Sequence, residues 1–335
     1  MPKYDFLVVG SSTVDLFVRT RHIERIDISG HMDNEAAVER LVCINFGSKT
    51  DLESLEIFPG GSAANSAVAM QHLGSETALL SCIGRDQFGN TALADLERHG
   101  VNTSPVVVNS SSGTGVGLNI TTPSGEKSVL VHRGANDLLG PEHLKESIVR
   151  ESRNIFVTSL VSENNFALFL KLVKLARKHS RRVVFAPSIS MLRRWLPQLL
   201  KVQAGFSLSI FNHEEGSFYT GKDRLKEILK RLPGNVSVLS KDVEGAYARE
   251  GSSFFHVKTL PVKISDTCGA GDAFSGAFAH FYSHGEKGSV GSALANAVGV
   301  AALKVATKGS RMDSSSRRIA SFLAENRSKL KVQKV

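Results

Sequence analysis

Apolar runs and helical stretches alternate along most of this chain. The short apolar runs are typical of buried strands and lie at residues 6–10, 77–83, 154–158, 182–186, 207–211 and 236–240. The segments with apolar or small residues at helical spacing are 63–73, 88–99, 165–179, 224–231, 269–283, 290–307 and 315–326. Strands that alternate with helices in this way predict an α/β fold, in which a mostly parallel sheet is covered by helices on both faces.

Two regions depart from this alternation. Residues 105–131 contain β-forming residues interrupted by turn signals, which fit two or three antiparallel strands. Residues 16–58 mix short apolar pieces with charged stretches, and within them 28–39 has the character of an insertion or a mobile loop. We expect residues 16–58 and 105–131 to form a small β lid. No internal repeat or low-complexity linker divides the chain, so residues 1–335 are predicted to form a single domain.

Composition narrows the class of protein. The chain has 335 residues, of which 41% are hydrophobic, which is ample for a large core. No apolar run is long enough to span a membrane, and the first residues lack the pattern of a secretory signal. The three cysteines, Cys43, Cys82 and Cys268, are far apart and lack metal-site spacing. This pattern argues against a disulfide framework and a structural zinc site, and it predicts a reducing, cytoplasmic location.

The formal net charge of +9 has two interpretations. A basic surface could bind nucleic acid or an anionic substrate, or it could simply be a solvated exterior. Positive residues are scattered, and clusters such as 181–182, 317–318 and 329–334 have no aromatic residues between them. We therefore predict neither nucleic-acid nor membrane binding.

The segment 266–274, DTCGAGDAF, carries the strongest chemical signal. Gly269 and Gly271 stand where a strand-like run, 262–264, gives way to a helix, and glycine lets the backbone approach a ligand closely. The first N–H groups of such a helix form an anion site. Asp272 would repel a phosphate, but it suits a base that takes a proton from a hydroxyl beside that anion site. The alternative is an aspartate that only stabilises the helix N-terminus.

This segment and its continuation to residue 278 resemble the C-terminal signature of the ribokinase (PfkB-type) carbohydrate kinase family. Segment 59–67, PGGSAANSA, and segment 82–89, CIGRDQFG, are similar to the N-terminal signature of the same family. Intermediate landmarks agree in order, and these are Gly10 with Asp15, 133–136, 212–215 and 240–245. The resemblance therefore covers nearly the whole chain.

The resemblance implies a ribokinase-like three-layer fold and an ATP-dependent phosphotransferase that acts on a hydroxyl of a small polyol. The expected acceptor is a sugar or a sugar derivative. Asp272 is then the general base, and the anion hole is formed by Gly269, Ala270 and Gly271. The residues expected to hold substrate hydroxyls are Asp15, Gly60, Gly61 and Asn65. From its sequence position alone, Asp15 could also be a turn residue after the first strand.

The nucleotide side is likewise implied by resemblance. Asn212 and Glu215 match the family's Asn-x-x-Glu motif, in which the carboxylate orders Mg²⁺ through water. Asn212 could equally cap a helix that begins at the next residue. The nucleotide loop is matched by Ser240, Asp242 and Gly245, where Asp242 replaces a glycine of the family pattern.

Two further roles follow from the family. Asn296, on the penultimate helix, would face the adenine, although a packing role fits it nearly as well. Some relatives bind a monovalent cation such as K⁺ beside the anion hole. Here the candidate ligands are Asp266 and the Cys268 carbonyl, with the loop 309–313 compatible in position.

The acceptor is less defined. Ribokinases proper carry a lysine after the paired glycines and a glutamate after a central strand, whereas this chain has Ser62 and no acidic residue in 158–161. Ribose held in that manner and a phosphofructokinase are therefore not expected. Basic residues that could contact an anionic sugar are Lys49, Arg85, His132 and Arg133, although each could be simply solvated and Arg133 could be structural.

The alternatives are a nucleoside kinase of the same family and a non-catalytic sugar- or nucleotide-binding scaffold. In a nucleoside kinase, Phe17 and Phe46 would wall the base, although both could be lid core. A homodimer formed through the lid is also expected from relatives.

Overall fold

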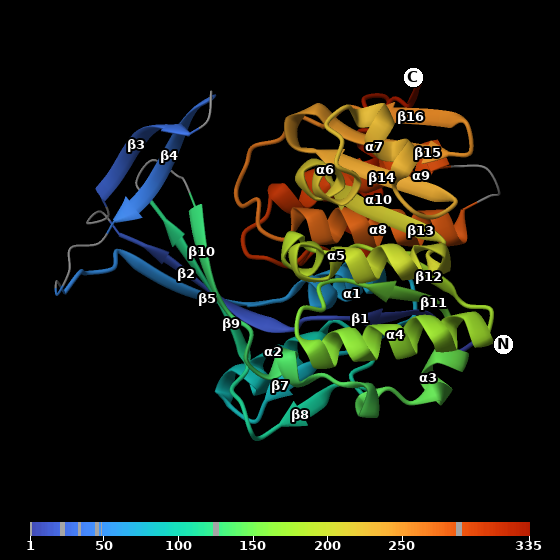
Figure 1. Cartoon of the computed structure of the whole chain (residues 1–335), viewed down its shortest axis with the longest axis horizontal. Helices are drawn as coiled ribbons and strands as arrows, with labels where there is room; N and C mark the ends of the chain where they lie inside the picture. Colours follow the sequence, from blue (N-terminus) through green and yellow to red (C-terminus); the bar gives the residue numbers. More distant parts are fainter. Residues whose placement is uncertain are drawn as a thin grey trace.

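The computed structural model describes residues 2–20, 24–32, 35–43, 47, 49–122, 127–285 and 290–335. Its main body contains a sheet of nine strands in the order β17-β16-β15-β14-β13-β12-β11-β1-β6 (Figure 1). The strands are β1 (Tyr4–Val9), β6 (Thr77–Leu80), β11 (Ser152–Val157), β12 (Arg182–Phe185), β13 (Leu208–Asn212), β14 (Val236–Lys241), β15 (Gly245–Glu250), β16 (Ser253–Val257) and β17 (Gln333–Lys334). All pairings from β6 to β14 are parallel, and β15, β16 and β17 add an antiparallel edge.

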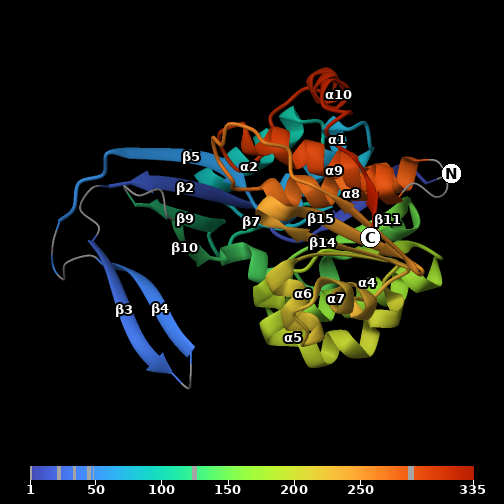
Figure 2. The ribbon, with the colours of Figure 1, turned by 90° about the horizontal axis from the view of Figure 1, so that it is seen from above.

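Helices cover both faces of this sheet (Figure 2). One layer holds α1 (Ser62–His72), α2 (Gln87–Arg98), α8 (Ala270–His284), α9 (Val290–Val305) and α10 (Ser316–Glu325). The other layer holds α3 (Glu146–Arg150), α4 (Glu163–Lys178), α5 (Ile189–Val202), α6 (His213–Thr220) and α7 (Leu225–Arg231). The predicted α/β arrangement is therefore observed.

Strand β1 shows why its sequence is continuously apolar. Phe6 and Val8 point into one hydrophobic core, and Leu7 and Val9 point into the other. Successive side chains of a strand face opposite sides, so a strand covered on both faces needs apolar residues at every position. This strand lies between β6 and β11, and the chain after its carboxyl end lines the candidate active site described below.

A second sheet of four strands projects from the layered body (Figure 1). Its order is β10 (Lys127–His132), β9 (Gly115–Thr121), β2 (Thr13–Arg19) and β5 (Ser54–Gly60). Strands β2 and β9 are parallel, and the outer pairs are antiparallel. Beyond this sheet, β3 (Glu24–Met32) and β4 (Glu35–Cys43) form an antiparallel hairpin.

Several expectations from the sequence need correction. In the range 28–39, residues 28–32 lie in β3 and residues 35–39 in β4, so these described residues form paired strands and not a loop. Within 105–131, β8 (Val107–Asn109) pairs in parallel with β7 (Cys82–Gly84), so only β9 and β10 join the four-stranded sheet. The run 262–264 forms no strand. The chain just after it instead donates N–H bonds to the Val305 carbonyl at the end of α9, from Ser265 and Asp266.

Two further observations concern membrane-spanning helices and the cysteines. None of the helices in the described part of the chain combines the length and the apolar character that a bilayer crossing requires. All three cysteines are free thiols.

Candidate active site

Two cavities open at the carboxyl ends of the parallel strands, where ligands bind in open α/β sheets. The larger has a volume of about 310 Å³ and lies between these strand ends and the four-stranded sheet. The smaller, about 240 Å³, lies over the ends of β12, β13 and β14. Four residues line both cavities, and these are Ser62, Ser159, Ser188 and Asp272. The two cavities therefore meet at the Asp272 carboxyl group.

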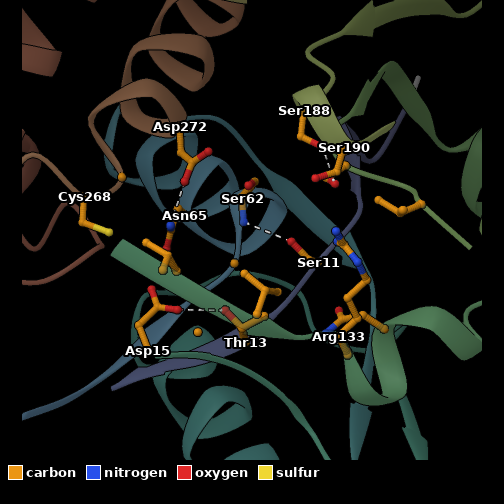
Figure 3. A pocket seen from close by; sticks show the side chains of 18 of the residues that line it. Ser11, Thr13, Asp15, Ser62, Asn65, Arg133, Ser188, Ser190, Cys268 and Asp272 are labelled. Atoms are coloured by element: carbon orange, nitrogen blue, oxygen red, sulfur yellow. Dashed lines mark hydrogen bonds between the residues drawn. The ribbon is translucent and has the colours of Figure 1, made fainter. Parts of the chain in front are cut away.

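Asp272 lies in the first turn of α8, which begins after Gly269. Gly269 has φ +74°, and a Cβ there would collide with the main-chain oxygen of Ser310, so only glycine allows this close approach. The carboxylate oxygen Oδ2 of Asp272 accepts a hydrogen bond of 2.8 Å from Nδ2 of Asn65 on α1 (Figure 3). The Ser66 hydroxyl donates to the Asp272 main-chain oxygen at 3.1 Å. Helices α1 and α8 thus hold the carboxylate in one position.

The electrostatics of Asp272 suit proton transfer. Burial is the main cause that raises its pKa, to about 7, and the negative charge of Asp15 raises it further. The hydrogen bonds from Asn65 and Ser62 and the positive charge of Lys304 act in the opposite direction. A carboxylic acid with a pKa near neutrality is matched to general-base catalysis at physiological pH.

Asp15 lies on β2 and faces the larger cavity. Its Oδ1 accepts a hydrogen bond of 3.3 Å from the Thr13 hydroxyl. Burial raises the pKa of Asp15, whereas a hydrogen bond from Ser310 and the charge of Arg311 lower it. A Cβ on Gly60 would collide with the Asp15 carboxylate, so this glycine makes room for Asp15 and does not itself line the cavity.

The other predicted substrate residues lie around the same space. Gly61, with φ +96°, is the N-cap of α1 and lines the larger cavity together with Asn65 and Arg133. Gly269 lines the same cavity, while Gly271 lines the smaller one. Ala270 lines neither cavity.

The remaining basic and aromatic candidates are placed elsewhere. Lys49, Arg85 and His132 are exposed and do not line either cavity. Phe17 packs edge-on against Phe58, with ring centroids 5.5 Å apart, and is not a lining residue. The other expected aromatic wall, Phe46, lies outside the described residues.

Several lining residues carry no motif and were missed from the sequence. They are polar or small side chains, including Ser11, Thr13, Ser62, Asn119, Ser188 and Ser190. A period-2 pattern would have found Asn119, because Gly115, Gly117 and Asn119 alternate along β9. Ser11 and Ser188 follow strand ends, whereas Ser62 and Ser190 lie in the first turns of α1 and α5, and no local pattern marks any of them.

The smaller cavity brings together Asn212, Glu215 and Ser240. Asn212 caps α6, because its Oδ1 accepts from the Glu215 N–H at 2.8 Å, and Glu215 Oε2 accepts from the Asn212 N–H at 2.9 Å. The capping role and a place at the cavity therefore coexist. Burial raises the pKa of Glu215 to about 7, and the charges of Glu214 and Asp272 contribute.

Three predicted nucleotide residues, Asp242, Gly245 and Asn296, line neither cavity. Asp242 replaces the family's glycine yet keeps a positive φ of 35°, a conformation that strains residues with a side chain. Gly245 has φ +100°, and a Cβ there would collide with the Val257 carbonyl. Asn296 is half-buried on α9.

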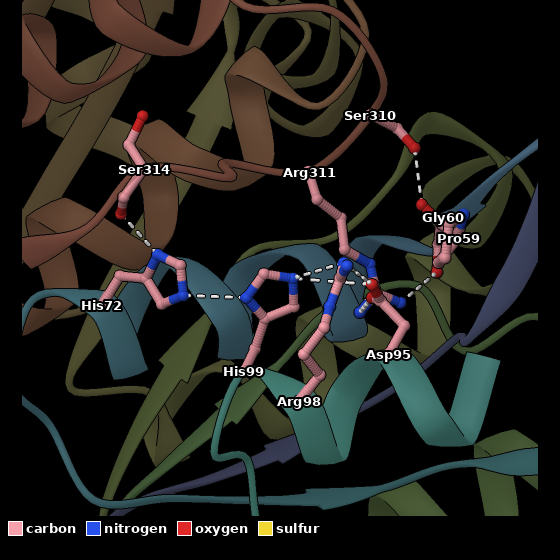
Figure 4. A network of polar contacts seen from close by, with 9 residues as sticks. All are labelled: Pro59, Gly60, His72, Asp95, Arg98, His99, Ser310, Arg311 and Ser314. Carbon is pink, nitrogen blue, oxygen red and sulfur yellow. Dashed lines mark hydrogen bonds and ion pairs between the residues drawn. The ribbon is translucent and has the colours of Figure 1, made fainter. Parts of the chain in front are cut away.

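A buried polar network supports the turn between β5 and α1 (Figure 4). Arg311 forms an ion pair with Asp95 and donates a hydrogen bond of 3.4 Å to the Gly60 carbonyl. His99 contacts the same aspartate at 3.5 Å, and His72 bonds to His99 at 2.9 Å. Separating Arg311 from Asp95 would leave a buried charge uncompensated, which is strongly destabilising. Because Arg311 also bonds to the Gly60 carbonyl, the network holds the glycine turn beside Asp15.

Comparison with known proteins identifies the family. The pfkB family of carbohydrate kinases matches residues 22–317. The chain belongs to this family. A deoxyribokinase of Salmonella typhi is 26% identical over 315 residues, covering 92% of this chain and 94% of the relative.

Solved structures of other sugar kinases share the fold of this pfkB-family chain. A probable sugar kinase from Rhizobium etli superposes with a TM-score of 0.80 at 20% identity, covering 99% of this chain and 100% of the other. Arabidopsis thaliana ribokinase, complexed with ribose and ATP, has a TM-score of 0.77 at 20% identity, with 96% and 98% covered. The predicted ribokinase-like fold is confirmed, and the protein is a carbohydrate kinase, an enzyme that phosphorylates an alcohol group.

Proposed function

We propose that the protein transfers the γ-phosphate of ATP to a hydroxyl of a small sugar or sugar derivative, with Asp272 as the general base. The observation that carries this proposal is the position of the Asp272 carboxyl group, which borders both cavities. The acceptor then occupies the larger cavity and the nucleotide phosphates the smaller. Support comes from the Arabidopsis ribokinase of the same fold, which binds ribose and ATP.

The reaction follows from this arrangement. The acceptor hydroxyl attacks the γ-phosphorus, a new O–P bond forms, and the bond to the β-bridging oxygen breaks, so that ADP leaves. Asp272 accepts the hydroxyl proton. The N–H groups at the start of α8, from Gly269 to Gly271, stabilise the charge on the transferred phosphoryl oxygens.

Mg²⁺ is the cofactor that such a reaction requires, and Glu215, which lines the smaller cavity, would hold it through water. Among the described residues no cluster of three or more metal-ligating side chains occurs. One carboxylate is sufficient, since Mg²⁺ keeps several waters and binds mainly through the nucleotide phosphates. When bound, the ion neutralises charge on those phosphates.

The lining of the larger cavity favours a sugar over a nucleoside. Asp15, Asn119 and Arg133, with several serines and Thr13, offer hydrogen-bonding groups for hydroxyls. No aromatic residue is among the described lining residues, so nothing there provides the flat apolar surface on which a base stacks.

The four-stranded sheet acts as a lid in this proposal. Its face toward the body presents Asp15, Gly117, Asn119, Val129 and Val131 to the larger cavity. These residues come from three strands, so movement of the sheet would open or close the acceptor site as one unit.

The opposite face of this sheet is suited to a second copy of the chain. A row of aliphatic side chains crosses all four strands, because Ile57 pairs with Leu16, Leu16 with Leu118, and Leu118 with Leu130. Ile57 is 50% exposed and Leu130 60% exposed. A contiguous apolar surface of this kind marks an interaction site, and a homodimer would bury it against its own copy.

The test is a coupled ADP-release assay over sugars, sugar phosphates, sugar acids and nucleosides, followed by Asp272→Asn. We expect turnover with at least one sugar and a loss of about 10²–10⁴-fold in kcat for the variant, because a general base contributes on that order. ATP affinity should be retained. Full turnover by Asp272→Asn, or turnover restricted to nucleosides, would contradict the proposal.

A further inference from the structure

Lys304, in the last turn of α9, is a lysine with no exposed side chain, and no other lysine in the described ranges is buried. Lysine almost never occurs in a protein interior unless its charge is paired. Removing an ammonium group from water is costly, so the surroundings of this one must compensate for the loss of hydration. The proposed role of Asp272 as general base does not by itself explain why Lys304 is buried.

The ammonium group lies where α9 meets the turn that precedes the anion hole. Its Nζ is 3.4 Å from the main-chain oxygen of Asp266. The N–H groups of Ser265 and Asp266 bond to the Val305 carbonyl at 2.9 and 3.1 Å, which ties this turn to the end of α9. Asp266 Oδ1 in turn accepts from the Cys268 N–H at 3.0 Å. The positive charge of Lys304 therefore lies against the turn that leads to Gly269.

The same turn contains the residues that the family resemblance assigns to a monovalent cation, Asp266 and the Cys268 carbonyl. An alkali cation would need these oxygen atoms, and an ammonium group held against one of them repels a second positive charge. The loop after α9 closes this region from the other side, since Gly269 packs against the Ser310 carbonyl. The residues present do not fit a bound K⁺ ion.

We infer that Lys304 takes the place of a monovalent cation at the anion hole, so that phosphotransfer by this protein does not depend on added K⁺. The inference rests on the proposed kinase function. The fixed ammonium holds the Asp266 carbonyl of the 266–269 turn and thereby helps to orient the N–H groups at the start of α8. Lys304 is a positioning residue, and its charge also favours the ionised form of Asp272.

The first experiment compares initial rates of the wild type in KCl and in tetramethylammonium chloride at equal ionic strength. We expect the two rates to agree. In Lys304→Ala, which removes the side chain beyond Cβ and leaves room for a cation, we expect the rate in tetramethylammonium chloride to fall about 100-fold, as when one preorganised charge is removed. KCl should restore much of that loss. Lys304→Met fills the space without charge and should stay slow in both salts.

A second measurement needs no turnover. The melting temperature of Lys304→Ala should rise when KCl replaces tetramethylammonium chloride, because a cation that binds only the native state stabilises it. The wild type and Lys308→Ala, an exposed lysine four residues further on, should show no such difference.

The outcomes separate the two proposals. Strong activation of the wild type by K⁺ would overturn the inference while leaving the kinase function intact. So would a fully active Lys304→Met, because the charge would then be unused. If no acceptor is phosphorylated but Lys304→Ala alone gains a K⁺-dependent melting temperature, the cation inference stands and the proposed function fails. If Lys304→Ala does not fold in either salt, the wild-type and Lys304→Met rates still decide the inference.

Discussion

The hydrogen bond from Asn65 to Asp272 should set the pH at which the enzyme becomes active. Asn65 Nδ2 donates to Asp272 Oδ2 at 2.8 Å, and this bond lowers the pKa of a carboxyl group that burial raises to about 7. A hydrogen bond to a charged group contributes about 1.5–3 kcal/mol. One pKa unit corresponds to about 1.4 kcal/mol, so Asn65→Ala should raise the pKa of Asp272 by about one to two units.

The sign of the effect follows from the catalytic form of the base. Only the ionised carboxylate accepts a proton, so kcat/KM falls as the pH drops below the pKa of Asp272. At pH 7 the wild type has about half of its Asp272 ionised, whereas the variant would have about a tenth to a hundredth. We therefore expect kcat/KM of Asn65→Ala to be about 5- to 50-fold lower at pH 7 and to recover above pH 9.

The assay is the pH profile of kcat/KM for the acceptor, measured at saturating ATP and Mg²⁺. Saturation with ATP and Mg²⁺ matters because Glu215, at the nucleotide cavity, also has a pKa of about 7 and interacts with Asp272 by charge. The titration of Glu215 would otherwise contribute to the same pH profile. Ser66→Ala is the matched control, since its hydroxyl contacts the main-chain oxygen of Asp272 and not the carboxylate. The kcat/KM of Ser66→Ala should fall on the acid side at the same pH as that of the wild type.

One result would refute this reasoning. If Asn65→Ala lowers kcat/KM equally at every pH and leaves the acid limb unmoved, then Asn65 acts only on the substrate or Asp272 is not the titrating base.

Three further outcomes follow from the same structure. The folded-state pKa of Asp272, about 7, lies above its unfolded value, so ionisation of this group destabilises the fold as pH rises from about 4 to 7. The free energy of unfolding of Asp272→Asn, measured with denaturant, should therefore equal that of the wild type near pH 4. At pH 8 it should exceed the wild-type value by at most about 4 kcal/mol. Gly269→Ala, with φ +74° and the Ser310 carbonyl in its way, should lose about 1–3 kcal/mol of stability, whereas Gly271→Ala, in open helical space, should lose none in the same assay. Ile57→Lys should convert a dimer into a monomer by light scattering, and a dimer that persists would place the interface elsewhere.

Local patterns in the sequence were sufficient for most of the body. The apolar runs that became β1, β11, β12, β13 and β14 are bounded by loops and covered on both faces, so their composition alone marks them. The motif ending at Asp272 was recognisable because it resembles a family signature, since an aspartate at a helix start could by itself simply stabilise the helix. Residues 258–265 carry no motif of this kind. The run 262–264 within them was expected to be a strand, but no strand forms there.

Other features depended on contacts between distant segments. The run 77–83 splits into β6 and β7 because β7 pairs with β8, and no residue within the run announces that partner. The network around Arg311 joins residues from α1, α2 and the loop after α9. Gly60 looked like a substrate ligand, but its role as a space for the Asp15 carboxylate is visible only in three dimensions.

By itself, the sequence predicted the α/β class and singled out Asp272 and the segment 269–271 as the candidate base and anion hole, because each of these depends on residues close together in the chain. Only the tertiary structure decided which side chains line each cavity, that the two cavities meet at Asp272, and that Lys304 is buried against the turn before α8. These properties arise where strand ends and helices from separate parts of the chain converge, and burial and charge at such points are set by neighbours that the local sequence does not contain.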